Sequence, residues 1–111
     1  MAYAKIDLFD TELQTCAELY KALAHPARLA ILKYLAETRT CISGDISDEL
    51  PLSRTTVNQH LAELKNVGLL IWHTEGTKTF YCLNLEKIKA LKIMSEKFIN
   101  EINISENCNC K

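Results

Sequence analysis

The sequence predicts a mainly α-helical domain that carries one β-hairpin before its last helix. Three observations point to this class. Hydrophobic residues recur every three or four positions over most of the chain, which is the spacing of an amphipathic helix. Residues 69–83 are instead rich in β-branched and aromatic residues around a central Glu75-Gly76 turn. The chain holds only three glycines and two prolines, so internal flexible linkers are not expected.

The first two expected helices are separated by His25-Pro26. Thr11 and Gln14 form a capping box at the start of a helix over residues 11–23. Pro26 suits the first position of the next helix, which is expected to run to about residue 37. The residues expected to face inward are Leu13, Cys16, Ala17 and Tyr20 in the first helix and Leu29, Leu32, Leu35 and Ala36 in the second.

A short helix and a longer one are expected next, back to back. Ser43 can cap the short helix, and Pro51 closes it. Ser53 can cap the longer helix over residues 54–66, and Gly68 suits the left-handed residue after its end. The buried stripe expected on this longer helix is Val57, Leu61 and Leu64. The predicted outline is therefore helix, short turn, helix.

The hairpin and a final helix complete the predicted chain. Its strands are residues 69–74 and 77–83. From Asn84 the helical period returns, with a seam that suits a partner helix at Ile88, Leu91, Ser95, Phe98 and Ile102. A helix-turn-helix followed at once by a two-stranded hairpin is the order of a winged helix-turn-helix, whose hairpin reaches a minor groove or phosphates of DNA.

Length and composition favour one domain. The 111 residues, 48% of them hydrophobic, can bury a single core. We expect residues 1–103 to form a domain for DNA binding and dimerisation, and residues 104–111 to form a flexible tail that contains cysteine. The sequence has neither a recognisable export signal nor an apolar run of membrane-spanning length, so it predicts a cytoplasmic protein without a membrane partner.

Charge and motifs exclude two function classes. Thirteen Lys and Arg against fourteen Asp and Glu give a formal net charge of -1, so any basic contacts to DNA must be locally placed. The sequence has no phosphate-binding glycine loop and no H-E-x-x-H motif, and its cysteines and histidines form no recognisable nucleophile pattern. It therefore argues against an enzyme and against binding by bulk positive charge.

The outer face of the helix over residues 54–66 is rich in small polar side chains. Its members, opposite the buried stripe, are Thr55, Asn58, Gln59 and Ala62. Asn and Gln can bond adenine edges, and Thr can contact thymine. Arg54 is placed for a guanine edge or a phosphate, and Lys78 near the hairpin tip for a phosphate. A merely solvated helix face would show the same spacing, so the flanking elements must decide.

The chain closely resembles the ArsR/SmtB family of metal- and metalloid-responsive repressors in the segments HPARLAILKYLAE and LPLSRTTVNQHLAELKNVGLLIWHTEGTKTFYCLN. The resemblance covers about residues 11–103. It implies a homodimer, held together by the first and last helices, that sits on a pseudo-palindromic operator in double-stranded DNA. Such a repressor needs no cofactor to bind DNA, and it blocks transcription until an effector binds.

Residue by residue, the resemblance implies two sets of contacts. The implied DNA contacts are Ser53, Arg54, Thr55, Thr56, Asn58, Gln59 and His60, together with Lys78 in the hairpin, which is the wing of this fold. For the implied pairing of the first and last helices, the apolar stripe and the seam of these helices supply the expected dimer contacts, which are Leu13, Cys16, Tyr20, Ile88, Leu91, Ser95, Phe98 and Ile102. Arg54 and Asn58 stand where Gln and Ser are common in relatives, so a different operator preference is expected. His60 borders the buried stripe, which leaves a packing role as its alternative.

Five cysteines guide the search for an effector. Their odd number and uneven spacing do not fit a secreted disulfide framework, so free thiols are expected. Cys108 and Cys110 on the polar tail have no core to fill and are the first candidate ligands, with two harmless thiols as the alternative. A third ligand is expected from Cys41 or Cys16. Packing is favoured for Cys16, in the apolar stripe, and for Cys82, at the end of a strand.

Soft thiolates favour soft ions, and three of them without histidine suit arsenite or antimonite. Zinc or cadmium needs a fourth donor and ranks second. The resemblance implies a sensing motif of the C-V-C-D-L type around Cys41, in which Ser43 replaces the second cysteine. A shift of one residue against the family motif would instead turn Cys41 toward the core, which stays open as its alternative. Two other functions stay open on the same scaffold: a repressor whose Cys108 or Cys110 is oxidised, and a winged helix that docks only proteins.

Overall fold

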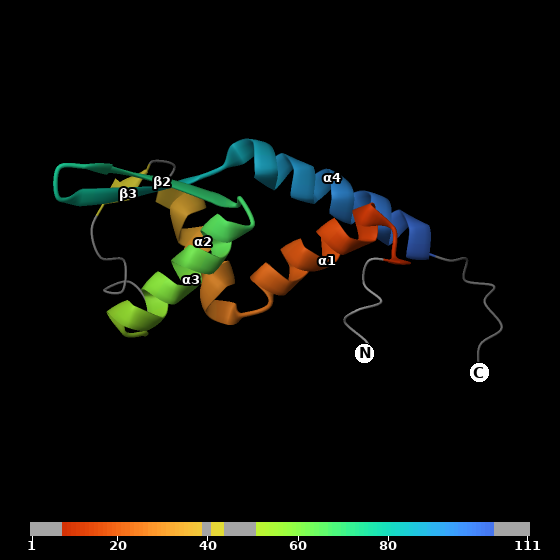
Figure 1. Ribbon diagram of the computed structural model, residues 1–111, viewed down its shortest axis with the longest axis horizontal. Helices are drawn as coiled ribbons and strands as arrows, with labels where there is room; N and C mark the ends of the chain where they lie inside the picture. Colours follow the sequence, from red (N-terminus) through yellow and green to blue (C-terminus); the bar gives the residue numbers. More distant parts are fainter. Residues whose placement is uncertain (1–7, 39–40, 44–50, 104–111) are drawn as a thin grey trace.

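Four helices and three strands make up the described part of the chain, which comprises residues 8–38, 41–43 and 51–103 of the computed structural model. In chain order these are α1 (Thr11–Leu23), α2 (Pro26–Thr38), β1 (Ile42–Ser43), α3 (Arg54–Asn66), β2 (Leu70–Glu75), β3 (Lys78–Leu83) and α4 (Leu85–Ile102). Figure 1 shows α2, α3 and the sheet at one end of the molecule, with α1 and α4 running side by side toward the other.

The elements confirm the mainly helical fold with a hairpin. α1 and α3 span the residues that the sequence predicts, and α2 and the hairpin strands lie within a residue or so of expectation. The difference concerns the short helix expected from Ser43. Ser43 lies in β1, a strand that the sequence did not predict, and residues 44–50 and the tail over residues 104–111 lie outside the described residues.

The start of α1 is capped differently from expectation. Asp10, rather than Thr11, is the N-cap, and its carboxylate accepts a hydrogen bond from the backbone N–H of Glu12 at 3.4 Å. Gln14 does not complete a capping box but donates from its side chain to the carbonyl of Phe9 at 2.8 Å. A carboxylate at this position also interacts favourably with the positive end of the helix, which is why Asp10 serves as the cap.

One hydrophobic core joins α1, α2, α3 and the start of the sheet. Its buried members are Leu19, Ile31, Leu35, Val57, Leu61, Leu64, Leu69 and Leu70. α2 contributes Ala27, Ile31 and Leu35, which are four residues apart along one face. The expectation that Leu29 faces inward is wrong, because it is two residues from Ile31, lies on nearly the opposite side of the helix and is 50% exposed.

β3 is the central strand of a three-stranded antiparallel sheet of order β1-β3-β2. Glu75 pairs with Lys78 around the turn at Gly76, whose φ of 64° lies in the left-handed region that glycine adopts at the lowest cost. β1 adds two residues along the other edge of β3, with Ile42 opposite Tyr81. The sheet therefore connects the hairpin to the chain segment that follows α2.

α4 packs beside α1. The Tyr20 hydroxyl donates to Oγ of Ser95 at 2.8 Å, and the rings of Tyr20 and Phe98 have centroids 6.4 Å apart. Nζ of Lys97 lies 2.7 Å from the Glu12 carboxylate. None of the residues of α4 is fully buried, so one long side of this helix is open to a further partner. Within residues 8–38, 41–43 and 51–103, no helix is both long enough and apolar enough to cross a membrane.

Candidate nucleic-acid interface

α3 separates its polar and apolar residues onto opposite sides. Val57, Leu61 and Leu64 are each no more than 1% exposed and hold the helix on the core. The opposite side presents four exposed side chains, Arg54, Thr55, Asn58 and Gln59. Amide, hydroxyl and guanidinium groups on an exposed helix face can bond base edges in a major groove. This side of α3 is therefore chemically suited to read DNA.

The start of α3 is held by a small hydroxyl network. Ser53 is the N-cap, as the sequence predicts, and its Oγ accepts from the backbone N–H of Thr56 at 3.2 Å. The same hydroxyl donates to Oγ1 of Thr56 at 2.9 Å. These two hydroxyls are thus already engaged in capping. The positive end of the helix dipole at this point also favours a phosphate nearby.

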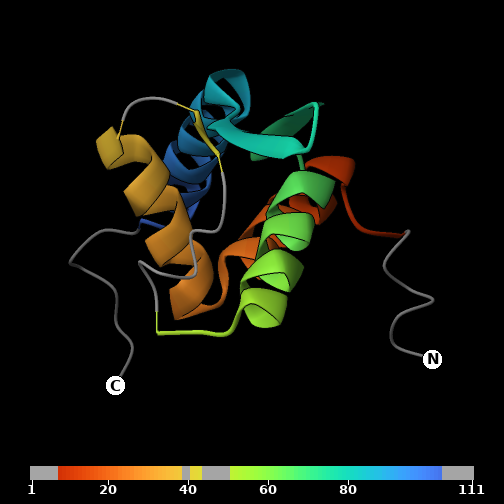
Figure 2. The ribbon, with the colours of Figure 1, turned by 90° about the vertical axis from the view of Figure 1, so that its left-hand side faces the viewer.

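The hairpin and α3 lie at the same end of the molecule (Figures 1 and 2). A hollow between them is lined by Asn58 of α3 and by side chains of the sheet, Trp72, Thr74, Thr79 and Tyr81. Lys78, which the sequence assigns to a phosphate, is exposed at the start of β3. One duplex could therefore meet both elements, the helix with its groove and the hairpin with its backbone.

Two residues that sequence reasoning missed join α3 to the hairpin. Nζ of Lys65 lies 4.0 Å from the ring centroid of Trp72, which is the geometry of a cation–π contact. Trp72 in turn packs edge-on against Tyr81, with ring centroids 5.7 Å apart. The available signal was the single tryptophan of the chain, placed in a strand that directly follows the helix. These contacts link the hairpin to α3.

His60 does not lie on the DNA-facing side, which corrects its place among the implied DNA contacts. The residue is 7% exposed, and its Nδ1 accepts a hydrogen bond from Nε of Arg28 at 3.0 Å. Its ring lies 4.3 Å from that of His25, centroid to centroid. The cause is helical geometry, because His60 is three residues from Val57 and shares its buried side. The packing role that the sequence left open is the one observed.

Burial, together with the nearby His25 and Arg28, lowers the pKa of His60 below its ordinary value of 6.5. A native state that binds fewer protons than the unfolded chain loses stability as the pH falls. The contribution of neutral His60 to the free energy of unfolding is therefore fully present above pH 6.5, and it is lost as the pH falls below that value. Urea denaturation at pH 7.5 and 5.5 should show a lower free energy of unfolding at pH 5.5.

The His60→Gln variant should weaken this pH dependence, because the group responsible no longer titrates. The Gln59→Ala variant is the matched control, since Gln59 is the exposed neighbour of His60 and carries no titratable group, so it should leave the dependence unchanged. Equal pH dependence in wild type and His60→Gln would contradict the assignment.

The cysteines differ most from expectation. Cys41 and Cys82, expected as free thiols, form a disulfide with their Cα atoms 4.5 Å apart. Cys16 is a free cysteine that is only 5% exposed, in keeping with the packing role favoured for it. Cys108 and Cys110 lie outside the described residues. Within the part of the chain that the structure describes, no three His, Cys, Asp or Glu side chains gather as a metal ion would require.

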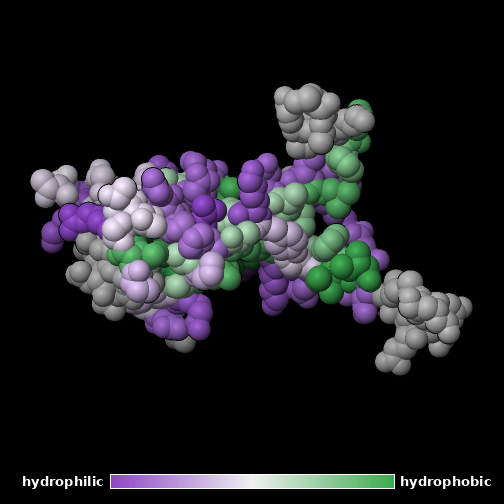
Figure 3. Space-filling model, turned by 90° about the horizontal axis from the view of Figure 1, so that it is seen from below, coloured by the Kyte–Doolittle hydropathy of each residue, from purple (hydrophilic) through white to green (hydrophobic). Residues whose placement is uncertain are grey.

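The predicted dimer residues fall into two groups. Most of them pack within the chain itself: Cys16 is buried, and Tyr20, Ile88, Leu91, Ser95 and Phe98 are half-buried between α4 and its neighbours. Leu13 and Ile102, by contrast, are 46% and 55% exposed. Phe9, just before α1, and Ile99 on α4 are also exposed apolar side chains. Figure 3 shows hydrophobic surface gathered at this end of the molecule.

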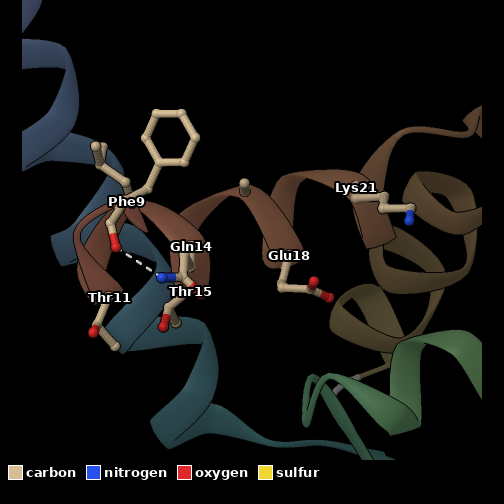
Figure 4. A pocket seen from close by; sticks show the side chains of 8 residues that line it. Phe9, Thr11, Gln14, Thr15, Glu18 and Lys21 are labelled. Carbon is tan, nitrogen blue, oxygen red and sulfur yellow. Dashed lines mark hydrogen bonds between the residues drawn. The ribbon is translucent and has the colours of Figure 1, made fainter. Parts of the chain in front are cut away.

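The exposed side of α1 also forms an open hollow (Figure 4). Phe9 and Leu13 line it together with polar residues such as Thr15 and Glu18. Gln14 also lines the hollow and donates a hydrogen bond to the Phe9 carbonyl. A mixed apolar and polar surface of this kind is typical of contacts between protein chains.

Comparisons with known proteins agree with this reading of the surface. Residues 23–71 match a family model described as a helix-turn-helix domain. The HTH-type transcriptional regulator MJ1325 of Methanocaldococcus jannaschii is 37% identical over 84 residues, which are 75% of this chain and 94% of that protein. The transcriptional activator HlyU of Vibrio cholerae is 37% identical over 73 residues, 66% of this chain and 67% of that protein.

Solved structures show the same fold. The structure of HlyU from Vibrio cholerae matches with a TM-score of 0.64 and 30% identity over 86% of this chain and 100% of that one. The homodimeric winged helix-turn-helix DNA-binding domain Mb0332 of Mycobacterium bovis, a possible ArsR-family regulator, matches with a TM-score of 0.59 and 25% identity. That match covers 96% of this chain and 94% of the Mycobacterium bovis chain.

Proposed function

The chain belongs to the ArsR/SmtB family of helix-turn-helix transcriptional regulators, and from this premise we propose that it is a dimeric repressor released from its operator by a thiophilic effector. The observation that carries the proposal is the amphipathic character of α3, whose apolar side chains are buried on one side and whose polar side chains are exposed on the other. Its back is fixed in the core, while Arg54, Thr55, Asn58 and Gln59 are exposed at the end of the molecule that also carries the wing.

The exposed apolar side chains on α4 and on or just before α1 support the proposed dimer. An isolated chain would leave Phe9, Leu13, Ile99 and Ile102 in water, and pairing with a second copy would bury them. The Mycobacterium bovis neighbour is itself homodimeric, which supports the same arrangement here. Two copies related by a twofold axis would present two α3 helices to half-sites about one helical turn apart, roughly 34 Å.

Direct reading of bases by α3 makes the first prediction for this function. The Gln59→Ala variant should lose about 1–3 kcal/mol of binding free energy on the preferred sequence and little on random DNA, because an amide bonds particular base edges. The Lys78→Ala variant should weaken both DNAs to a similar degree and lower the salt dependence, because a phosphate contact carries no sequence information.

The measurement begins by selecting the preferred duplex from a random pool with the wild-type protein. Titrations by fluorescence anisotropy at several salt concentrations then give Kd for both variants on the selected and on a scrambled duplex. Equal losses on the two duplexes for Gln59→Ala would contradict direct reading by this residue. Failure of the wild type to bind any duplex at low ionic strength would overturn the proposed function itself.

The effector is proposed from the chemistry of the cysteines. Cys108 and Cys110 supply two thiolates, and Cys41 is the accessible third, because Cys16 is only 5% exposed. Three thiolates suit arsenite or antimonite, with zinc or cadmium as the second choice. Cys41 can act in this way only after its bond to Cys82 is reduced. Changing Cys108 and Cys110 to Ser should leave DNA binding intact and abolish its release by arsenite.

A response to oxidants is the second candidate. The sequence raised it for the tail thiols, and the disulfide between Cys41 and Cys82 is the specific observation that favours it. Under this candidate the redox reaction takes place in the body of the domain, and the tail is not required. Titrating the DNA-bound protein with arsenite, antimonite, zinc and cadmium, and separately measuring its affinity for DNA with and without peroxide in the presence of a chelator, distinguishes the two candidates. Release by one of the ions supports the first candidate, and a change of affinity with peroxide supports the second.

A further inference from the structure

We propose that Cys41 and Cys82 form a reversible thiol–disulfide site that is oxidised by peroxides. The disulfide ties the segment between α2 and α3 to the hairpin, and it thereby increases the affinity for DNA. The pair joins two parts of the chain that are 41 residues apart. Its chemical assignment is independent of the proposed function, and only its effect on DNA rests on that function.

Strand register explains why the two sulfurs meet. β1 and β3 pair with Ile42 opposite Tyr81 and Ser43 opposite Phe80, so the next pair along the antiparallel ladder is Cys41 and Cys82. Residues that face each other across such a ladder point to the same side of the sheet. A Cα separation of 4.5 Å is that of a directly opposed pair and lies within the range that a disulfide spans. The backbone therefore brings the thiols together by itself.

The pair is accessible to small reactants. Cys41 is exposed, and Cys82 is half-buried on the central strand. A peroxide would oxidise the Cys41 thiolate to a sulfenic acid and release hydroxide or an alkoxide. The Cys82 thiol would then attack this sulfur, forming the disulfide and releasing water. A dithiol reductant reverses the reaction by thiol–disulfide exchange and becomes a disulfide itself.

The disulfide lies beside β1, which is the shortest strand of the described sheet. β1 has only two residues, and such a short ladder contributes few hydrogen bonds to hold the chain between α2 and α3. On the other side, Cys82 is next to Tyr81, which packs against Trp72 and through it reaches Lys65 of α3. Oxidation thus ties the entry to the helix-turn-helix to β3, which the Trp72 contacts separately join to α3. Ordering these parts before binding removes part of the cost of ordering them on DNA.

The site is tested first by mass spectrometry. A Cys108→Ser/Cys110→Ser chain, which keeps Cys16, Cys41 and Cys82, is reduced, freed of reductant and treated with hydrogen peroxide in the presence of a chelator. Trypsin cuts after the basic residues at 39, 54, 78 and 87, so the bond should link peptide 40–54 to peptide 79–87. This linked peptide should form with peroxide and disappear with dithiothreitol. Its absence after peroxide, or a bond that dithiothreitol leaves intact in the folded protein, would overturn the site.

Amide hydrogen exchange tests whether the disulfide stabilises the pairing of β1 with β3. Reduction should speed exchange in peptides that cover residues 41–43 and 79–83 by about tenfold or more, and should leave the middle of α3 protected. The Cys41→Ser/Cys82→Ser variant should match the reduced wild type under both conditions. Cys16→Ala is the matched control and should keep the full response to peroxide. If reduction left the exchange rates of these peptides unchanged, the disulfide would not hold the segment between α2 and α3 against the hairpin.

The effect on DNA is measured with the duplex selected by the wild type. We expect the oxidised chain to bind about tenfold more tightly than the reduced chain, and Cys41→Ser/Cys82→Ser to ignore peroxide. Equal affinity of the two forms, or release by peroxide, would overturn the control of DNA binding while the mass result stands. If neither form binds DNA, the proposed function fails, and the redox site is still decided by the linked peptide.

Discussion

The Leu13→Glu/Ile102→Glu variant is expected to be monomeric at micromolar concentration and to bind its operator roughly 10²- to 10⁴-fold more weakly than the wild type. Both side chains are about half exposed in the single chain, so the fold should tolerate the charges. In a dimer that buries these positions, carboxylates would be desolvated without a partner. A monomer reaches one half-site at a time and loses the effective concentration that linked recognition helices provide.

Analytical ultracentrifugation and anisotropy titration measure the two effects, with circular dichroism to confirm folding. The matched control is Leu29→Glu/Ile93→Glu, which adds the same charge at two exposed apolar positions. Ile93 lies nine residues, or two and a half turns, before Ile102 and is therefore on the opposite side of α4. The control should stay dimeric. A dimeric Leu13→Glu/Ile102→Glu variant would place the interface elsewhere.

The helical part of this fold was readable from the sequence because its signals are local. α1 and α3 each repeat apolar residues with the helical period, and Ser53 and Gly68 mark the cap and the left-handed exit, where Gly68 has a φ of 83°. The Glu75-Gly76 turn located the hairpin in the same way. The outer face of α3 followed from the same periodicity, since whichever side is not buried is available to DNA.

Contacts between distant segments could not be read in this way. β1 has two residues, too few for a period of two to be visible, and its partner strand lies about 40 residues later. The pairing of Cys41 with Cys82 depends on that register. The sequence made Cys41 one of two candidates for the third effector ligand and favoured a packing role for Cys82. Once β1 is placed beside β3, the disulfide follows from the numbering alone.

The dimer seam on α4 is an intermediate case. The period correctly identified the side of the helix that packs, but it cannot say against what. In the structure Ser95 and Phe98 are occupied by Tyr20 of the same chain. Leu13 and Ile102 remain exposed at the edge of this seam, which is why the proposed contact with a second copy is placed there. Burial within the chain and burial between chains select the same residue types, which is why pattern alone does not separate them.

The Leu61→Ala variant is expected to lose about 2–5 kcal/mol of unfolding free energy, because it removes a side chain that is only 1% exposed and leaves a cavity behind α3. Gln59→Ala is the matched control on the same helix. Its side chain is exposed, so its free energy of unfolding should stay within about 0.5 kcal/mol of the wild type. Urea denaturation at fixed protein concentration and fixed redox state measures both values.

The affinity for DNA should depend on these two substitutions in the opposite way to the free energy of unfolding: Gln59→Ala should lower it and Leu61→Ala should not. Leu61→Ala leaves every group on the outer face of α3 in place, so its folded fraction should bind the selected duplex with nearly wild-type Kd once the temperature is low enough for folding. Gln59→Ala should stay folded and lose affinity for that duplex. If Leu61→Ala lost affinity while fully folded, the position of α3 on the core would itself be part of recognition, and α3 could not be treated as a rigid reader carried by a stable base.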